Sequence, residues 1–188
     1  SQIGKIANMD DTQLKSVAQK IFDPSETNPE IILSARKVIN DADPLAWNAI
    51  TRAEIERRMG SIRADIGSPN NIQAVENIPS QLFNSIFGNK KSRDVLYAAV
   101  DPDTRSNLKY LETALKRATT GRPGGSQTGV RSEISQDLKG GFVQSIRDFI
   151  RSPIDKSISV GENSMSDARV KALSNVLFDP SYKVEMKR

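Results

Sequence analysis

The sequence contains neither cysteine nor histidine among its 188 residues, and aromatic residues make up only 5% of it. Without cysteine there is no disulfide framework, thiol nucleophile or cysteine-based zinc site, and without histidine the usual imidazole base and metal ligand are missing. The chain also lacks the 18 consecutive apolar residues of a membrane span and an apolar signal core near its start. We therefore expect no cofactor, no bound metal, no membrane span and no small-molecule substrate.

Apolar residues recur with helical spacing, and turn-forming residues mark the helix ends. The segment 10–22 is amphipathic, follows an Asp that can cap a helix, and is stopped by Asp23-Pro24. Asn28-Pro29, Asp43-Pro44 and Asp101-Pro102 open three further helices, since proline is favoured in the first turn. Other helices are predicted at 80–87, ended by Gly88, and at 92–100, 130–151 and 165–178.

Strand signals are almost absent, because no sustained period-2 run rich in Val, Ile and Thr occurs. The sequence predicts an all-α fold, an irregular multi-helix bundle of short helices joined by Asp-Pro and Gly-rich turns. We expect a helical domain at 1–120, a Gly-rich linker loop at 121–129, and a C-terminal helical arm at 130–188 that packs on neighbours. Because the chain begins at Ser1 rather than Met, we also expect a processed product or a piece of a longer polypeptide.

Two segments of fifteen residues align without gaps, 11–25 (DTQLKSVAQKIFDPS) and 167–181 (DARVKALSNVLFDPS). They share six positions, including the whole Phe-Asp-Pro-Ser ending. Each is typical of a helix whose last apolar residue docks in a core before Asp-Pro stops it. Two interpretations stay open: common helix-stop chemistry used twice, or a duplicated helical module.

Glycines interrupt the helical pattern at two places. Residues 121–129 (GRPGGSQTG) form a loop that is a flexible connector, a subunit contact or a phosphate contact, although the strand and the Gly-Lys-Ser/Thr ending of a nucleotide loop are missing. A glycine pair inside 130–151 predicts a kink or, functionally, a hinge, since each glycine costs a helix about 1 kcal/mol relative to Ala. The loop and hinge glycines are Gly121, Gly124, Gly125, Gly129, Gly140 and Gly141.

The net charge of +4 lies entirely in the second half of the chain. Residues 1–94 hold 12 basic and 12 acidic residues, whereas 95–188 hold 15 and 11. Ten basic residues between 105 and 156 form solvated helix faces or a diffuse surface for nucleic acid or an acidic partner. These residues are Arg105, Lys109, Lys116, Arg117, Arg122, Arg131, Lys139, Arg147, Arg151 and Lys156.

The acidic residues and serines suggest no catalytic group. Glu54 and Arg58 have the i,i+4 spacing of an ordinary surface ion pair. No Gly-x-Ser-x-Gly arrangement of a serine hydrolase occurs. We therefore predict that the chain is not an enzyme.

The run 108–153 contains a helix closing on Arg-Ala, a Pro-Gly-Gly-Ser-Gln-Thr linker, a Leu-x-Gly-Gly break and a following Arg-Ser-Pro. In these features it resembles the pattern near the ends of very long virion proteins of tailed bacteriophages, the internal or DNA-ejection class. The stretch 43–59, with Asp-Pro, Ala-Trp and a charged tail, and the closing Leu-Phe-Asp-Pro are similar to the same proteins.

The resemblance implies a helical structural component of a virion, assembled in the host cytoplasm and packed in or near the portal and tail. Its partners would be other virion proteins and further copies of itself, with the DNA backbone as an additional contact. The alternative hypothesis is a helical protein that binds nucleic acid without sequence preference. No catalytic motif of the enzymes carried by such giant proteins matches a position in this sequence.

Overall fold

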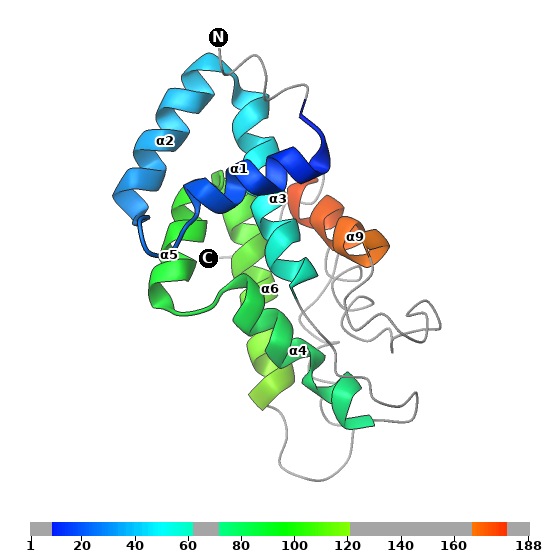
Figure 1. Ribbon diagram of the computed structural model, residues 1–188. Helices are drawn as coiled ribbons and strands as arrows, with labels where there is room; N and C mark the ends of the chain where they lie inside the picture. Colours follow the sequence, from blue (N-terminus) through cyan, green and yellow to red (C-terminus); the bar gives the residue numbers. More distant parts are fainter. Residues whose placement is uncertain (1–8, 62–71, 121–166, 180–188) are drawn as a thin grey trace. The chain divides into compact units, whose positions relative to one another are not determined.

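The structure, a computed structural model, describes residues 9–61, 72–120 and 167–179. The prediction of an all-α fold is confirmed, since all regular elements in these ranges are helices and none is a strand. None of the described helices is both long enough and apolar enough to cross a bilayer. Figure 1 shows the helices α1 (Asp11–Ile21), α2 (Pro29–Ala42), α3 (Pro44–Gly60), α4 (Ile72–Ile86), α5 (Lys90–Ala99), α6 (Pro102–Thr120) and α9 (Asp167–Phe178).

Side-chain caps start the first three helices where the sequence predicts them. The Asp10 carboxylate accepts a hydrogen bond from the backbone N–H of Gln13 (2.8 Å), and the Gln13 side chain accepts one from the Asp10 N–H (3.1 Å). Asn28 and Asp43 accept backbone N–H groups in the same way at the starts of α2 and α3, at 2.9 and 3.0 Å. These bonds satisfy donors that have no partner inside a helix, so local chemistry alone sets these three boundaries.

The start of α4 differs from the prediction, whereas its end agrees. The helix begins at Ile72 and continues through Pro79, so the predicted start at Ser80 is wrong. Proline removes one backbone donor and bends a helix, but neighbouring turns can hold the helix together on both sides of it. After the last residue of α4, Gly88 adopts a φ of 55°, the left-handed conformation that glycine takes without steric strain at a helix end.

The start of α5 also lies earlier than expected. The helix begins at Lys90 rather than Ser92, because the Asn89 side chain accepts the N–H of Ser92 (2.9 Å) and caps the helix there. The predicted helix at 165–178 is confirmed in its described part as α9, which begins at Asp167. The predicted helix at 130–151 lies outside the described residues.

The helices belong to two compact units. Unit 1 contains α1, α2, α3 up to Arg58, and α5, and unit 2 contains α4 up to Ser85, α6 and α9. The polypeptide chain therefore leaves unit 1 after Arg58, within α3, and returns to it at Ile86, the last residue of α4. The predicted division at 121–129 stays a prediction, because residues 121–166 lie outside the described part of the chain.

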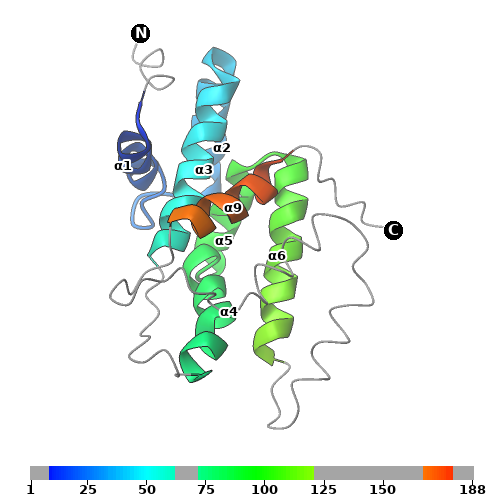
Figure 2. The same ribbon diagram turned by 90° about the vertical axis from the view of Figure 1, so that its right-hand side faces the viewer.

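Within unit 2, α9 packs against α6 although the two helices are far apart in the sequence. Figure 2 shows the C-terminal end of α9 beside the N-terminal half of α6. The Asn107 side-chain amide donates a hydrogen bond to the backbone carbonyl of Leu177 (3.1 Å) at this contact. Among residues 170–178 of α9, whose burial the structure describes, the buried ones are Val170, Leu173, Ser174 and Leu177.

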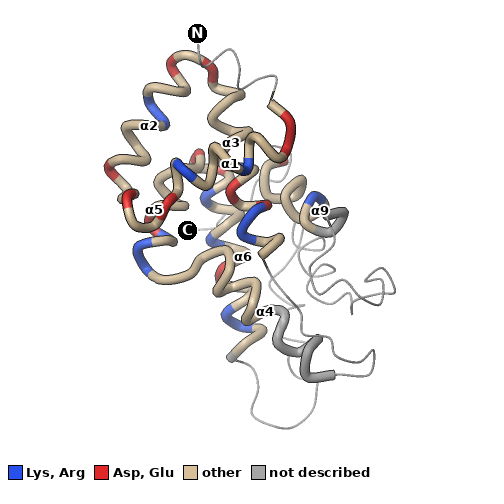
Figure 3. Tube along the Cα trace, in the orientation of Figure 1, with Lys and Arg blue, Asp and Glu red and all other residues tan. Residues whose placement is uncertain are grey.

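Charged residues are interspersed along the helices of both units. Figure 3 shows basic and acidic positions following one another along the chain rather than gathering on separate helices. Ion pairs between residues four apart on one helix account for part of this pattern, as at Lys90 and Asp94, whose Nζ and Oδ2 atoms are 2.7 Å apart. Such exposed pairs contribute little to stability, about 0.2–1 kcal/mol each.

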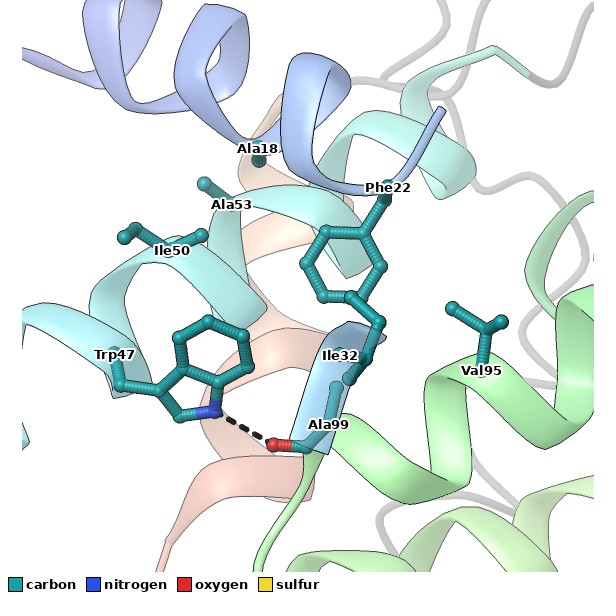
Figure 4. Packing of buried hydrophobic residues seen from close by; sticks show 8 residues of the cluster. All are labelled: Ala18, Phe22, Ile32, Trp47, Ile50, Ala53, Val95 and Ala99. Atoms are coloured by element: carbon teal, nitrogen blue, oxygen red, sulfur yellow. Dashed lines mark hydrogen bonds between the residues drawn. The ribbon is translucent and has the colours of Figure 1, made fainter. Parts of the chain in front are cut away.

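The core of unit 1 is built around Trp47 of α3, the only tryptophan of the chain (Figure 4). The ring centroids of Trp47 and Phe22 are 6.3 Å apart, in a tilted arrangement that aromatic pairs favour. Apolar residues from four helices surround this pair. The buried cluster consists of Ala18, Phe22, Ile32, Trp47, Ile50, Ala53, Val95 and Ala99.

Side chains from other helices satisfy the backbone carbonyls at the end of α5. The Trp47 indole N–H donates to the carbonyl of Ala99 (2.7 Å), and the Arg36 guanidinium donates to that of Val100 (2.9 Å). The last carbonyls of a helix have no partner within the helix, so these bonds replace water in a buried environment. They fix the C-terminal end of α5 to α2 and α3.

Candidate interaction surfaces

Four of the ten basic residues singled out from the sequence lie in the described part of the chain, and all four are on α6. At about 100° per residue they fall within an arc of about 120° around the helix axis. The structure therefore brings them to one side of α6, and three are exposed while Arg105 is half-buried. We call this surface the basic arc; it consists of Arg105, Lys109, Lys116 and Arg117.

The charge of the basic arc is partly compensated within unit 2. The Lys116 Nζ atom lies 2.7 Å from Glu112 Oε1 and 5.5 Å from the centroid of the Phe83 ring. A cation above an aromatic face is attracted by its quadrupole, so both contacts hold this side chain in place. The Arg105 Nε atom is buried without a hydrogen-bond partner.

The remaining predicted interaction residues lie outside the described residues, and nothing in the structure tests them. The loop and hinge glycines belong to this group. The basic residues in it are Arg122, Arg131, Lys139, Arg147, Arg151 and Lys156.

A second group of exposed residues is apolar and was not singled out from the sequence. All of the large apolar side chains that are exposed among the described residues lie between 31 and 45. Ile31, Leu33 and Val38 of α2 are 48%, 50% and 64% exposed, and Leu45 in the first turn of α3 is 78% exposed. Single exposed apolar residues are ordinary, but Ile31 and Val38 lie on the same side of α2, two helical turns apart, and this pairing favours contact with another molecule. Leu33 lies on the opposite side of α2. We call these four residues the apolar segment.

The apolar segment exists because α2 is apolar over a wider arc than unit 1 buries. Sequence spacing places Ile31 and Val38 on the same side as Ile32 and Ile39. In the structure Ile32 is buried and Ile39 packs against the core, whereas Ile31 and Val38 lie at the exposed edge of that side. Periodicity alone does not show which edge of an apolar arc a core covers.

The ion pair of Glu54 and Arg58 is buried, so the prediction of an ordinary surface pair is wrong. The Glu54 side chain is fully buried, and that of Arg58 is 9% exposed. Arg58 Nε lies 2.7 Å from Glu54 Oε1, and Arg57 donates to both carboxylate oxygens at 2.8 and 2.9 Å. The reason is that α3 is buried on several sides near its C-terminal end, where Ile55 also has no exposed surface.

Arg58 also connects α3 to a distant part of unit 1. Its Nη1 atom donates to the backbone carbonyl of Ile86 (2.7 Å) and to the hydroxyl of Ser92 (3.0 Å). The hydrogen bonds to Glu54 raise the pKa of Arg57 above its ordinary value, although burial acts in the opposite direction. This cluster holds the α4–α5 connection on α3, and all of its charged groups have partners, which is typical of a structural role.

Two Ser-x-x-Lys sequences occur on helices, Ser34 to Lys37 on α2 and Ser106 to Lys109 on α6. In hydrolases of this pattern the lysine must lose its proton near neutral pH, which requires burial. Both lysines are exposed here. The Ser106 hydroxyl donates to the carbonyl of Pro102 (3.0 Å), a common bond of serine within a helix. These residues therefore support no catalytic assignment.

The turn after α1 holds an exposed carboxylate with a lowered pKa. Asp23 Oδ1 accepts hydrogen bonds from the Ser25 hydroxyl (2.5 Å) and the Ser25 backbone N–H (2.8 Å). Both bonds favour the charged carboxylate, so they lower the pKa of Asp23 below its ordinary value of 3.8. The resulting stabilisation is present above pH 3.8 and is lost as the pH falls through the lowered pKa.

Replacing Ser25 by alanine should raise the pKa of Asp23 toward 3.8, because the hydroxyl bond is the larger cause of the shift. An NMR titration of the Asp23 carboxyl carbon measures this directly. Ser34→Ala, an exposed serine on α2, is the matched control and should leave the midpoint unchanged. An identical Asp23 midpoint in the wild-type chain and in Ser25→Ala would contradict the assignment.

Neither the grouping of side chains in the described residues nor comparison with known proteins identifies a molecule or metal that this chain binds. Among the residues that the structure describes, no three acidic side chains gather in the way that a metal site requires. No family model, curated protein or solved structure matches the chain. The apolar segment and the basic arc are the candidate interaction sites in the described part of the chain.

Proposed function

We propose that this chain is a non-enzymatic structural component of a tailed-phage virion, of the internal, DNA-ejection or portal–tail type, and that it binds neighbouring subunits. The observation that carries the subunit-binding part is the apolar segment of α2 and α3. The virion part rests on the resemblance of the run 108–153 to long virion proteins.

The apolar segment suits a contact between proteins better than a contact with water. Burying the exposed parts of Val38 and Leu45 against a partner would gain about 25 cal/mol for each Å² of apolar surface removed from water. Both residues lie close to the turn at Asp43, so one partner surface can cover them together. Their side chains are among the most exposed large apolar groups in the described residues, so substituting them leaves the core of unit 1 intact.

The experiment is incorporation of the chain into particles. Val38→Lys combined with Leu45→Lys should leave the melting temperature within about 2 °C of wild type, because surface substitutions change stability by about 0.5 kcal/mol or less. The same variant should be depleted at least tenfold from purified particles, as measured by quantitative mass spectrometry. Ser34→Lys adds a charge at an exposed position of α2 without removing apolar surface, so this variant should be incorporated normally.

Two results would contradict this proposal in different ways. Absence of the wild-type chain from purified virions would remove the virion assignment. Normal incorporation of the doubly substituted chain would remove the apolar segment as the contact surface.

A second candidate function is binding of nucleic acid without sequence preference, which the basic arc of α6 favours. Lys109 and Lys116 are exposed and lie on the same side of α6, about two helical turns apart, and the exposed Arg117 follows Lys116 directly. Contacts between such side chains and phosphates release counterions, so log affinity should fall linearly with log salt. A titration of the chain with duplex DNA at several salt concentrations tests it, and no binding at low salt removes this candidate.

A further inference from the structure

The exposed side of α2 carries an apolar pair and a charged pair with the same spacing. Ile31 and Val38 are seven residues apart in the sequence, and so are Glu30 and Lys37. All four side chains are exposed, and neither Glu30 nor Lys37 forms an ion pair with another residue in the described part of the chain. Because seven residues are about two helical turns, each pair forms a line along the helix axis.

Ser34 lies between these two lines. At about 100° per residue, the apolar line lies 40–60° to one side of Ser34, and the charged line lies equally far to the other side. The Ser34 side chain is exposed and small, so a second helix can approach closely at this point. We call this surface the outer side of α2; it consists of Glu30, Ile31, Ser34, Lys37 and Val38.

Two antiparallel copies of α2 would match each other at their outer sides. Antiparallel pairing centred between residues 34 and 35 places Ile31 opposite Val38 of the second copy, and a two-fold axis repeats the contact. Glu30 is then offset from Lys37 of the second copy by only about 3 Å along the helix axis, since each residue advances a helix by about 1.5 Å. Parallel pairing would instead place each of these charges against the same charge of the second copy.

The distribution of charge along α2 also favours antiparallel pairing. Figure 3 shows basic residues in the middle of α2 and acidic residues toward its two ends. In the arrangement above, Asp41 falls opposite Asn28, the N-cap of α2, in the second copy. A negative charge is favourable there, because the backbone N–H groups at a helix start carry partial positive charge. The outer side is therefore complementary to itself both in charge and in apolar surface.

We propose that the outer side of α2 binds the outer side of a second copy of this chain in antiparallel orientation. Apolar contacts then lie along one edge of the helix pair, and ion pairs between Glu30 and Lys37 lie along the other edge. Two helices of 14 residues bury less than the roughly 1,200 Å² of a stable protein interface, so the dimer is weak. We expect a dissociation constant on the order of 100 µM.

This pairing goes beyond the proposed virion contact, which uses Val38 together with Leu45. Both contacts need Val38, so a chain forms one of them at a time, and pairing covers this apolar surface in the free chain. A chain that cannot pair is still expected to enter particles. Ser34→Lys should behave in this way, because it brings two ammonium groups together at the two-fold axis but leaves Val38 and Leu45 in place.

Charge reversal tests the pairing, with sedimentation equilibrium of the full-length chain at concentrations up to about 1 mM as the measurement. Glu30→Lys and Lys37→Glu each turn two attractive contacts into repulsive ones, so either change alone should raise the dissociation constant about tenfold. The double variant restores opposite charges and should pair like the wild type. An equimolar mixture of the two single variants should form heterodimers with wild-type affinity, because every contact between positions 30 and 37 then joins opposite charges.

Val38→Ser and Leu33→Ser are matched apolar substitutions. Both side chains are exposed, but Leu33 lies outside the outer side of α2, so only Val38→Ser should weaken pairing, by about fivefold. Circular dichroism verifies that each variant is folded. A wild-type chain that is monomeric at the highest concentration would overturn the proposal, as would single charge variants that pair like the wild type.

The mixture of single variants keeps the test independent of any damage that a single substitution does to α2. If the folded single variants do not pair with each other, the contact between Glu30 and Lys37 is wrong. Because these experiments use the purified chain, their failure leaves the virion assignment intact. Absence of the chain from virions would likewise leave the pairing of α2 intact.

Discussion

Replacing Trp47 by alanine should lower the free energy of unfolding of unit 1 by about 4 kcal/mol. The substitution removes the largest side chain of the buried cluster and leaves a cavity between Phe22 and Ile50. It also leaves the carbonyl of Ala99 without the indole N–H that it accepts at 2.7 Å. Urea unfolding followed by far-UV circular dichroism measures the change, since the chain has no other tryptophan.

Trp47→Phe separates the two contributions of this side chain. Phenylalanine keeps part of the apolar volume but has no N–H, so the loss should be about 2 kcal/mol. Leu45→Ala, on the same helix but mostly exposed, is the control and should change stability by about 0.5 kcal/mol or less. A Leu45→Ala loss as large as that of Trp47→Ala would show that the core lies elsewhere.

Replacing Arg58 by methionine should destabilise unit 1 by about 3 kcal/mol. Among the described residues, the fully buried Glu54 carboxylate then keeps only Arg57 as a partner, and the carbonyl of Ile86 loses the Arg58 donor. Removing one member of a buried ion pair leaves a charge that water cannot reach, which is why this loss exceeds that of a surface pair. Fluorescence of Trp47 during urea unfolding reports the change, because both residues belong to unit 1.

Lys90→Met is the matched control for Arg58→Met. Lys90 also pairs with a carboxylate four residues away on its helix, but its side chain is 82% exposed. Its loss should therefore change stability by about 0.5 kcal/mol or less. An Arg58→Met loss of stability as small as that of Lys90→Met would show that the ion pairs of Glu54 with Arg57 and Arg58 do not hold the α4–α5 connection on α3.

Helix starts were predictable from the sequence wherever the cap is local. Asp10, Asn28 and Asp43 each accept an N–H from two or three residues further along, so the residues that determine the boundary stand next to each other in the sequence. The start of α4 was not predictable in this way. Proline is favoured in the first turn of a helix, but Pro79 lies inside α4, which begins at Ile72.

The candidate surfaces were only partly predictable, because burial depends on distant residues. The sequence predicted ten basic residues as solvated helix faces or a diffuse surface, and the described part of the chain contains four of them, all on α6. Spacing did not reveal that Glu54 and Arg58 are buried, since the partner carbonyl of Ile86 is 28 residues from Arg58. It also did not show that the core of unit 1 leaves Ile31 and Val38 exposed.

The bonds that fix α5 have a consequence for the order of events during synthesis of the chain. Trp47 and Arg36 reach carbonyls at residues 99 and 100, and Arg58 reaches the carbonyl of residue 86. A ribosome therefore releases α1, α2 and α3 well before the segment that completes their shared core. Until α5 emerges, the part of the core that Val95 and Ala99 complete stays uncovered, so slow translation between residues 59 and 101 should prolong the period in which nascent chains bind chaperones.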